Sequence, residues 1–305
     1  MDPWASAAEI ARAVTAGETT ALAVVEAALA RIAVRDKVLN SFTAVTTERA
    51  IARARAVDAA RAGGKPVGAL AGVPFAVKNL FDVAGVPTLA GSKINRDLAP
   101  AAADSPLIER LEANGAILVG ALNMGEYAYD FSGENVHYGP SRNPHHTQHM
   151  TGGSSGGSGA AVAGGLVPLS LGSDTNGSIR VPSSFCGLFG LKPTYGRLSR
   201  ARTFPFVASL DHLGPLTRTP RDLAMAYDAM QGPDAEDPVC TSRPVEPTLA
   251  RLDGGIAGLR IAVAGGYFRR GASAEALEAV ARVARSLGAG REVELPESAR
   301  ARAAA

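Results

Sequence analysis

Two serine clusters framed by glycine lie in one stretch of the sequence, between residues 151 and 190. The first has the sequence GGSSGG over residues 152–157, and the second has the sequence DTNGS over residues 174–178. A serine hydroxyl attacks an acyl group when a base accepts its proton and nearby N–H groups stabilise the oxyanion. Successive backbone N–H groups of the second cluster can point into one concavity. These donors belong to Thr175, Asn176, Gly177 and Ser178. The second cluster is therefore a candidate nucleophile turn, and a strand-to-helix turn with a serine cap is the alternative.

The first cluster carries two adjacent serines, Ser154 and Ser155, with a pair of glycines on either side. Glycine adopts backbone angles that other residues avoid, so this density predicts an unusual conformation held by packing. A flexible glycine-serine linker is the alternative interpretation. The flanking segments are apolar and have helix and strand patterns, which favours two serines placed for a function.

Lys78 is the candidate base. The segment ALAGVPFAVKNLFDVAG has a short apolar run between glycines, which predicts a buried strand that ends near Lys78. Burial disfavours the charged ammonium, so the pKa of such a lysine falls below its usual value of about 10.4. A neutral amine would then be available to accept a proton. A lysine that reaches solvent from a strand end is the common alternative.

The elements that must position these residues alternate between helices and strands. Helical patterns cover residues 4–15, 20–34, 46–61, 105–114, 157–165, 220–230 and 274–287. Strand patterns cover residues 68–78, 116–122, 166–172, 188–192, 214–217, 259–264 and 293–295. This alternation predicts an α/β fold in which helices cover both faces of a mixed, largely parallel sheet.

The 305 residues are predicted to form a single domain with a sizeable core. A helical N-terminal segment, residues 1–65, precedes a catalytic core over residues 66–230. Residues 231–255 are rich in proline and aspartate, which predicts a linker. Residues 256–305 form a terminal βαβ pattern.

The composition narrows the class of partner. With 31 Lys and Arg against 29 Asp and Glu, the net charge is +2, which argues against binding to nucleic acid or to an anionic membrane. Cys186 and Cys240 cannot make a disulfide framework and lie in no metal-ligand spacing, which favours a reducing, cytoplasmic location. The sequence predicts no signal peptide and no membrane-spanning segment. We expect a soluble protein that acts on a small molecule or binds another protein.

Two other site types fit the sequence poorly. The pattern GxSxG occurs at Ser154 and at Ser155, as in the nucleophile elbow of α/β-hydrolases, but the residues before it predict no strand. His145, His146 and His149 lie in a loop that contains Pro144, where no helix would place two of them on one face. No metal site is predicted there.

Lys78, Ser154 and Ser178 together resemble the catalytic set of the amidase signature family. The motif GGSSGG and the block GSDTNGSIRVP match that family's pattern almost letter by letter, and Ser178 follows Ser154 by 24 residues, as the pattern requires. The resemblance continues through AGVPFAVKNLFDVAG and FCGLFGLKPTYGRLSR and covers practically the whole chain. It implies the amidase signature fold.

The resemblance also implies a role for each residue. Lys78 would be the base, Ser154 would have a cis peptide bond and relay the proton, and Ser178 would attack the amide carbon. The N–H groups of residues 175–178 would hold the oxyanion, with no metal or cofactor. The supporting residues would be Ser155, Asp174 and Arg180. Binding of a substrate carboxylate is the alternative role for Arg180.

Within the family, VKNLFDVAGVPTLAGSKINR and SDTNGSIRVPSS resemble the biuret and 1-carboxybiuret hydrolase subgroup, with Asn176 where many relatives have glycine. The implied reaction is hydrolysis of a C–N bond of a small amide or ureide through an acyl-enzyme, with release of ammonia. The alternative is the glutaminase component of a glutamyl-tRNA(Gln) amidotransferase. Both relatives work beside a small helical subunit, so such a partner and a homo- or hetero-oligomer are expected.

Members of the family continue well beyond the point where this sequence stops. The resemblance therefore implies that the C-terminal part of the fold, which supplies further sheet and much of the substrate pocket, is missing here. A truncated, inactive fragment that only binds a partner protein is a third hypothesis.

Overall fold

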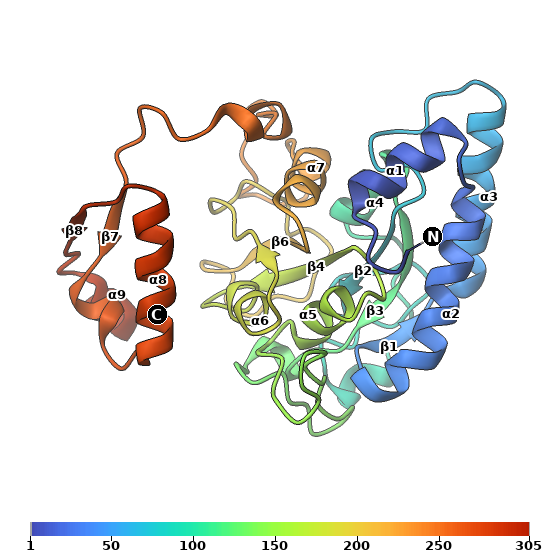
Figure 1. Cartoon of the computed structure of the whole chain (residues 1–305). Coiled ribbons are helices and arrows are strands. Elements are labelled where there is room, and N and C mark those ends of the chain that lie inside the picture. Colours follow the sequence, from blue (N-terminus) through green and yellow to red (C-terminus); the bar gives the residue numbers. More distant parts are fainter. Residues whose placement is uncertain (1, 305) are drawn as a thin grey trace. The chain divides into compact units, whose positions relative to one another are not determined.

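The computed structural model describes residues 2–304. The chain forms two compact units that divide between Ala250 and Arg251, and each is described on its own (Figure 1). Within the described part, no helix is both long enough and apolar enough to cross a membrane.

A six-stranded sheet forms the centre of the first unit. Its strands are β1 (Phe42–Val45), β2 (Pro74–Lys78), β3 (Ile117–Leu122), β4 (Leu169–Asp174), β5 (Phe189–Gly190) and β6 (His212–Thr217). Their order is β1-β3-β2-β4-β6-β5. The central strand β2 pairs in parallel with both β3 and β4, whereas the pairs β1–β3, β4–β6 and β5–β6 are antiparallel. The predicted α/β fold with a mixed sheet is confirmed, and parallel pairing is confined to the three central strands.

Helices pack against this sheet in two groups. They are α1 (Ala7–Ala16), α2 (Ala21–Leu39), α3 (Thr47–Ala62), α4 (Pro106–Ala113), α5 (Gly156–Ala163), α6 (Arg180–Phe185) and α7 (Pro220–Met230), with short 3-10 turns η1 (Lys93–Asp97) and η2 (Glu126–Ala128). In the first group, α2 packs against α3 and α5. In the second group, α7 packs against α1 and α4. Ser6 closes a capping box with Glu9, so α1 begins at Ala7 and not at the predicted residue 4.

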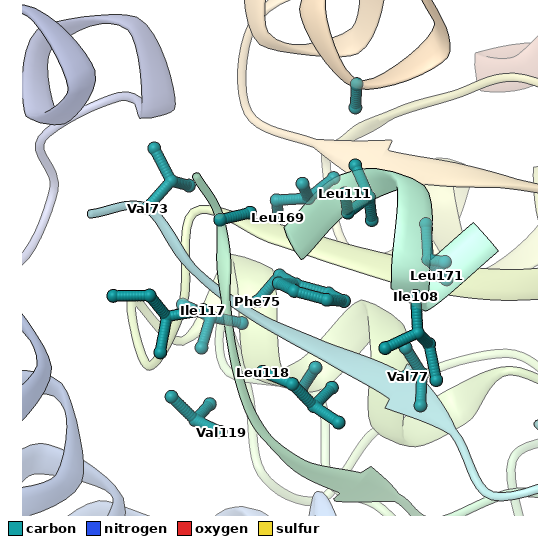
Figure 2. Close-up of a cluster of buried hydrophobic side chains, with 14 of the residues drawn as sticks. Val73, Phe75, Val77, Ile108, Leu111, Ile117, Leu118, Val119, Leu169 and Leu171 are labelled. Carbon is teal, nitrogen blue, oxygen red and sulfur yellow. The ribbon is translucent and has the colours of Figure 1, made fainter. Parts of the chain in front are cut away.

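The core lies where the central strands meet the helices. Every residue of β2, β3 and β4 is buried, as expected for parallel strands covered on both sides. Figure 2 shows a cluster of buried side chains from this core; those it labels are Val73, Phe75, Val77, Ile108, Leu111, Ile117, Leu118, Val119, Leu169 and Leu171. The three parallel strands therefore form a rigid base for residues at their carboxyl ends.

Two local differences from the predicted elements affect the site. The strand β1 was not predicted, because its four residues are too few to show a period. The strand predicted over 166–172 begins at Leu169 and continues to Asp174. Residues 166–168 instead complete the turn after α5, where the N–H groups of Leu166 and Val167 both reach the carbonyl of Ala161. Ser173 and Asp174 therefore belong to β4.

The second unit consists of a parallel pair of strands with helices. Its elements are β7 (Ala262–Ala264), η4 (Gly266–Arg269), α8 (Ala274–Ser286), β8 (Arg291–Val293) and α9 (Ser298–Ala304), and η3 (Leu249–Gly254) spans the boundary. β7 and β8 pair in parallel on either side of α8 in the sequence, as the terminal βαβ pattern predicts. Ser273 caps α8 through a hydrogen bond from the N–H of Ala276.

The segment 231–255, predicted as a linker, is largely part of the first unit. The side chains of Gln231 and Asp237 are buried there, and Asp237 pairs with Arg200 at 3.1 Å. Buried polar contacts of this kind fix the segment against the unit, so its proline-rich composition reflects irregular structure and not a free tether. The single-domain organisation stays a prediction.

Candidate active site

Lys78 is the last residue of β2, and its side chain is fully buried, with 0% exposed. Its Nζ donates to Ser154 Oγ at 2.6 Å and to Ser173 Oγ at 2.8 Å. The first contact joins two residues whose roles the sequence predicts. The second partner, Ser173, was not predicted.

Burial lowers the pKa of Lys78 from 10.5 to about 7. The negative charges of Asp174, Asp211 and Asp130 act in the opposite direction and keep the pKa from falling further. None of these carboxylates forms an ion pair with Lys78, and the described residues contain no other ion-pair partner for it. A substantial fraction of Lys78 is therefore a neutral amine near pH 7, as a general base requires.

Ser154 lies at the start of the turn into α5. The peptide bond between Gly153 and Ser154 is cis, which is the conformation that the resemblance implies. Gly153 has no room for a side chain, because a Cβ there would collide with the carboxylate of Asp130 and lie 2.7 Å from the backbone nitrogen of Gly133. Asp130 itself accepts hydrogen bonds from the N–H groups of Ser132 and Gly133. The glycine before Ser154 is thus required by close packing and not by flexibility.

Ser178 stands in the turn between β4 and α6 and is 5% exposed. Within the described chain its Oγ makes no hydrogen bond, and no hydrogen bond joins Ser154 to Ser178. The structure therefore brings Lys78 and Ser154 into direct contact, whereas the second link of the expected relay, from Ser154 to Ser178, is not formed in it.

The carboxylate of Asp174 organises the nucleophile turn, residues 174–178. It accepts from the N–H of Gly177 at 2.8 Å and from those of Ile179 and Arg180 at 3.2 and 3.3 Å. Burial raises the pKa of Asp174, but the guanidinium of Arg180 together with the backbone N–H groups of Ile179 and Arg180 outweighs burial and holds that pKa below its usual value. Asp174 is therefore a carboxylate that fixes the turn.

The four expected oxyanion donors do not remain equivalent. The N–H of Gly177 is engaged by Asp174, so the expectation that it faces an oxyanion is corrected. Three others, on Thr175, Asn176 and Ser178, donate to no acceptor in the described residues. Gly177 has a φ of +137°, which an L residue rarely adopts.

The supporting residues have the following contacts. Arg180 donates to both oxygens of Asp174, through Nε at 2.9 Å and Nη2 at 2.8 Å, which favours the supporting role over carboxylate binding. Ser155 Oγ donates to the carbonyl of Ser173 at 3.2 Å and accepts from its N–H at 3.3 Å. Ser155 thus holds the strand end that carries the second partner of Lys78.

Ser173 was missed because its role depends on strand pairing. Val77 of β2 lies opposite Leu171 of β4 in a parallel register, so Lys78 and Ser173 reach the same edge of the sheet. The available signal was the serine two positions before Thr175, at the end of an apolar strand. This signal does not identify Lys78 as the partner of Ser173, because that requires the register in which β2 and β4 pair.

A small cavity of about 190 Å³ adjoins this serine. It is lined by Leu80, Ser173, Phe204, Phe206, Asp211 and Leu213, among others. The loop that carries Phe204 and Phe206 contacts the 3-10 turn η2, where the ring centroids of Tyr127 and Phe204 lie 5.3 Å apart.

The histidine-rich loop forms no metal centre within the described residues. No group of three His, Cys, Asp or Glu side chains there is arranged to hold a metal ion. The ring of His145 instead contacts the carbonyl of Cys186, with an Nε2–O distance of 2.9 Å.

Comparisons with known proteins agree with one another. The family model for amidases matches residues 23–299. The chain is 58% identical over 297 residues to AtzE, a component of the 1-carboxybiuret hydrolase of Pseudomonas sp. (strain ADP), covering 97% of this chain and 65% of that protein. It is 48% identical over 274 residues to a component of the glutamyl-tRNA(Gln) amidotransferase of Azotobacter vinelandii (strain DJ / ATCC BAA-1303), covering 90% of this chain and 56% of that one.

A solved structure gives the same result for the fold. It belongs to a vestigial protein complex described as revealing the evolutionary origins of an s-triazine catabolic enzyme. The TM-score is 0.97 at 57% identity, over 98% of this chain and 66% of that chain. The sequence thus spans about two thirds or less of the length of these relatives.

Proposed function

The chain belongs to the amidase family, and on that premise we propose that it hydrolyses a C–N bond of a small amide or ureide through an acyl-enzyme. The observation that carries the proposal is the buried Lys78, whose Nζ contacts Ser154 Oγ at 2.6 Å. A lysine with a pKa of about 7 supplies a base at neutral pH. Ser178, in the adjoining turn, is the proposed nucleophile.

The first step is attack on the amide. Ser178 Oγ gives its proton to Ser154 Oγ while Ser154 passes its own proton to the neutral Nζ of Lys78. The new bond joins Ser178 Oγ to the carbonyl carbon, and the carbonyl oxygen becomes an oxyanion. The free N–H groups of Thr175, Asn176 and Ser178 stabilise this charge. The proton then returns through Ser154 to the leaving nitrogen, and ammonia or an amine departs.

The second step regenerates the serine. Water attacks the acyl-enzyme and gives its proton to the same relay, so the acid product leaves with Ser178 protonated. The contact between Lys78 and Ser154 suits both directions of transfer, because a neutral amine has a lone pair that accepts the Ser154 hydroxyl proton and a charged one donates it back. Ser173 retains one N–H of Lys78 throughout, which keeps Nζ beside Ser154.

The substrate that we propose is biuret, 1-carboxybiuret or a similar small ureide. Its support is the 58% identity to a component of a 1-carboxybiuret hydrolase. Glutamine hydrolysis, within a tRNA-dependent amidotransferase, is the second candidate and is supported by 48% identity to an amidotransferase component. Ammonia release measured with glutamine, biuret, 1-carboxybiuret and simple aliphatic amides separates the two. Release from glutamine alone would contradict the ureide proposal.

A partner protein is part of the proposal. The similar solved structure belongs to a protein complex, and we propose that this chain too works beside a small helical subunit. Turnover should therefore be measured both without and with that subunit. If the chain binds it but an active-site fluorophosphonate never labels Ser178, the hypothesis of an inactive, partner-binding fragment replaces the enzyme. The cytoplasmic location also stays a proposal, and it rests on the free thiols of Cys186 and Cys240.

A further inference from the structure

Asp211 lies directly before β6 and contacts two separate parts of the site. Its Oδ1 accepts a hydrogen bond from Thr175 Oγ1 at 2.5 Å. The same carboxylate accepts from the N–H of Phe206 at 2.8 Å and from that of Val207 at 3.0 Å. Asp211 is only 8% exposed. One buried carboxylate thus joins the nucleophile turn to the loop over residues 204–207.

That loop forms a wall of the 190 Å³ cavity, where Phe204 and Phe206 lie with Asp211 itself and with Ser173. Ser173 accepts a hydrogen bond from Lys78 Nζ. The cavity is therefore in contact with the partner of the candidate base, and a displacement of the loop would alter the surroundings of both the base and the turn.

Asp211 lines the same cavity as Ser173, the hydrogen-bond partner of Lys78, and its negative charge favours the ammonium form of that lysine. Three carboxylates favour the ammonium form of Lys78, namely Asp174, Asp211 and Asp130. Asp174 is paired with the guanidinium of Arg180 through two hydrogen bonds, and Asp130 accepts from Ser132 and Gly133. Asp211, like Asp130, has only neutral hydrogen-bond donors and no ion-pair partner in the part of the chain that the structure describes.

We propose that Asp211 is a positioning residue of this site, which fixes the cavity wall at Phe206 and Val207 against Thr175 and supplies negative charge near Lys78. The proposal rests on the proposed amidase function for its catalytic meaning. Its physical content, the tie to Thr175 and the charge near Lys78, can be measured without a substrate.

Titration of Lys78 tests the charge. The chain is labelled with 13C-lysine, the Cε signal of Lys78 is assigned by its loss in Lys78→Arg, and its midpoint is followed with pH. Asp211→Asn should lower the midpoint by about half a pH unit or more, because an attractive charge is removed from a buried site. Asp228→Asn is the matched control, since Asp228 also accepts from a threonine hydroxyl at 2.7 Å and from two backbone N–H groups at 2.9 Å. Equal midpoints in Asp211→Asn and wild type would overturn the proposal.

A substitution of Thr175 tests the hydrogen bond between Thr175 and Asp211 without changing any charge. It also provides a test if Asp211→Asn fails to fold. Thr175→Val should leave the Lys78 midpoint unchanged and lower kcat about tenfold, since small misplacements of catalytic groups are costly. Thr175→Ser, which keeps the hydroxyl, should restore kcat. Full activity in Thr175→Val would overturn the positioning role. A wild-type chain that hydrolyses no amide would contradict the proposed function, and the Lys78 titration would still decide the role of Asp211.

Discussion

Asp174 and Arg180 form a two-bond ion pair across the turn that presents Ser178, with Nε–Oδ2 and Nη2–Oδ1 distances of 2.9 and 2.8 Å. Asp174 is buried, whereas the side chain of Arg180 is 54% exposed. The same carboxylate holds the N–H of Gly177. The pair therefore fixes the backbone on both sides of the candidate nucleophile, and the guanidinium is already occupied.

Arg180→Ala should lower kcat about tenfold or more, because a loosened turn misplaces both Ser178 and the oxyanion donors. The loss should be equal for neutral amides and for substrates that carry a carboxylate, as measured by steady-state ammonia release. Arg285→Ala, which removes an exposed ion pair with Glu278, is the control and should leave kcat unchanged. An increase in KM confined to carboxylate substrates would instead assign Arg180 to substrate binding.

Ser178→Ala should abolish ammonia release and labelling by an active-site fluorophosphonate, since no other atom replaces the attacking oxygen. Ser183→Ala is the matched control, because Ser183 lies in α6 and its hydroxyl donates to the carbonyl of Ile179. The control should be labelled like the wild type. Labelling is read by mass spectrometry of the peptide, and a label retained in Ser178→Ala would show that Ser178 is not the nucleophile.

The candidate site could be predicted as far as its residues are adjacent in sequence. Ser154 and Ser178 stand in short glycine-framed motifs, and Lys78 stands at the end of a continuous apolar run. The structure places Lys78 against Ser154. The α/β fold followed from the same patterns, because buried parallel strands are continuous apolar runs.

Contacts between distant strands could not be predicted. Ser173 meets Lys78 only because β2 and β4 pair in one particular register. The N–H of Gly177 turns toward Asp174 because the turn closes on that carboxylate, and no sequence pattern states which way an N–H points. β1 was missed for a simpler reason, since a four-residue strand shows no periodicity.

The pH dependence of activity should report Lys78. Because the proposed base must be neutral, kcat/KM should rise as the pH increases through about 7, the pKa of Lys78 in the folded protein. Lys78→Arg should show no activity at any pH, because a guanidinium stays protonated. The measurement is ammonia release across the range from about pH 5 to about pH 9, with labelling rates as a second readout. A rate that does not change on either side of neutral pH would contradict a lysine base with this pKa.

The same pKa predicts a cost in stability. In the unfolded chain Lys78 regains a pKa of about 10.4, whereas burial lowers it to about 7 in the folded state. Between these values the unfolded state binds more protons, so the free energy of unfolding rises with pH, and the penalty is complete below the folded pKa. Lys78→Met removes it. The stability of Lys78→Met relative to wild type should therefore fall between about pH 6 and about pH 10, by about 4 kcal/mol as an upper bound.

Urea unfolding followed by the fluorescence of Trp4, the single tryptophan, measures this difference for the first unit. Lys65→Met is the control, because Lys65 is exposed. The stability of Lys65→Met relative to wild type should be the same at about pH 6 as at about pH 10. A constant difference for Lys78→Met across the range would mean that Lys78 is not desolvated in the folded protein.

Gly153→Ala should disrupt the site through packing. A Cβ at this position would collide with the carboxylate of Asp130 and press on the backbone of Gly133, so either the 130–133 turn or the Ser154 peptide must move. We expect a lower melting temperature and a loss of kcat of about tenfold or more, because Ser154 is then displaced from Lys78. Gly290→Ala, where a Cβ meets no atom within 4 Å, should change neither quantity. Wild-type kcat in Gly153→Ala would mean that the relay does not depend on this close packing.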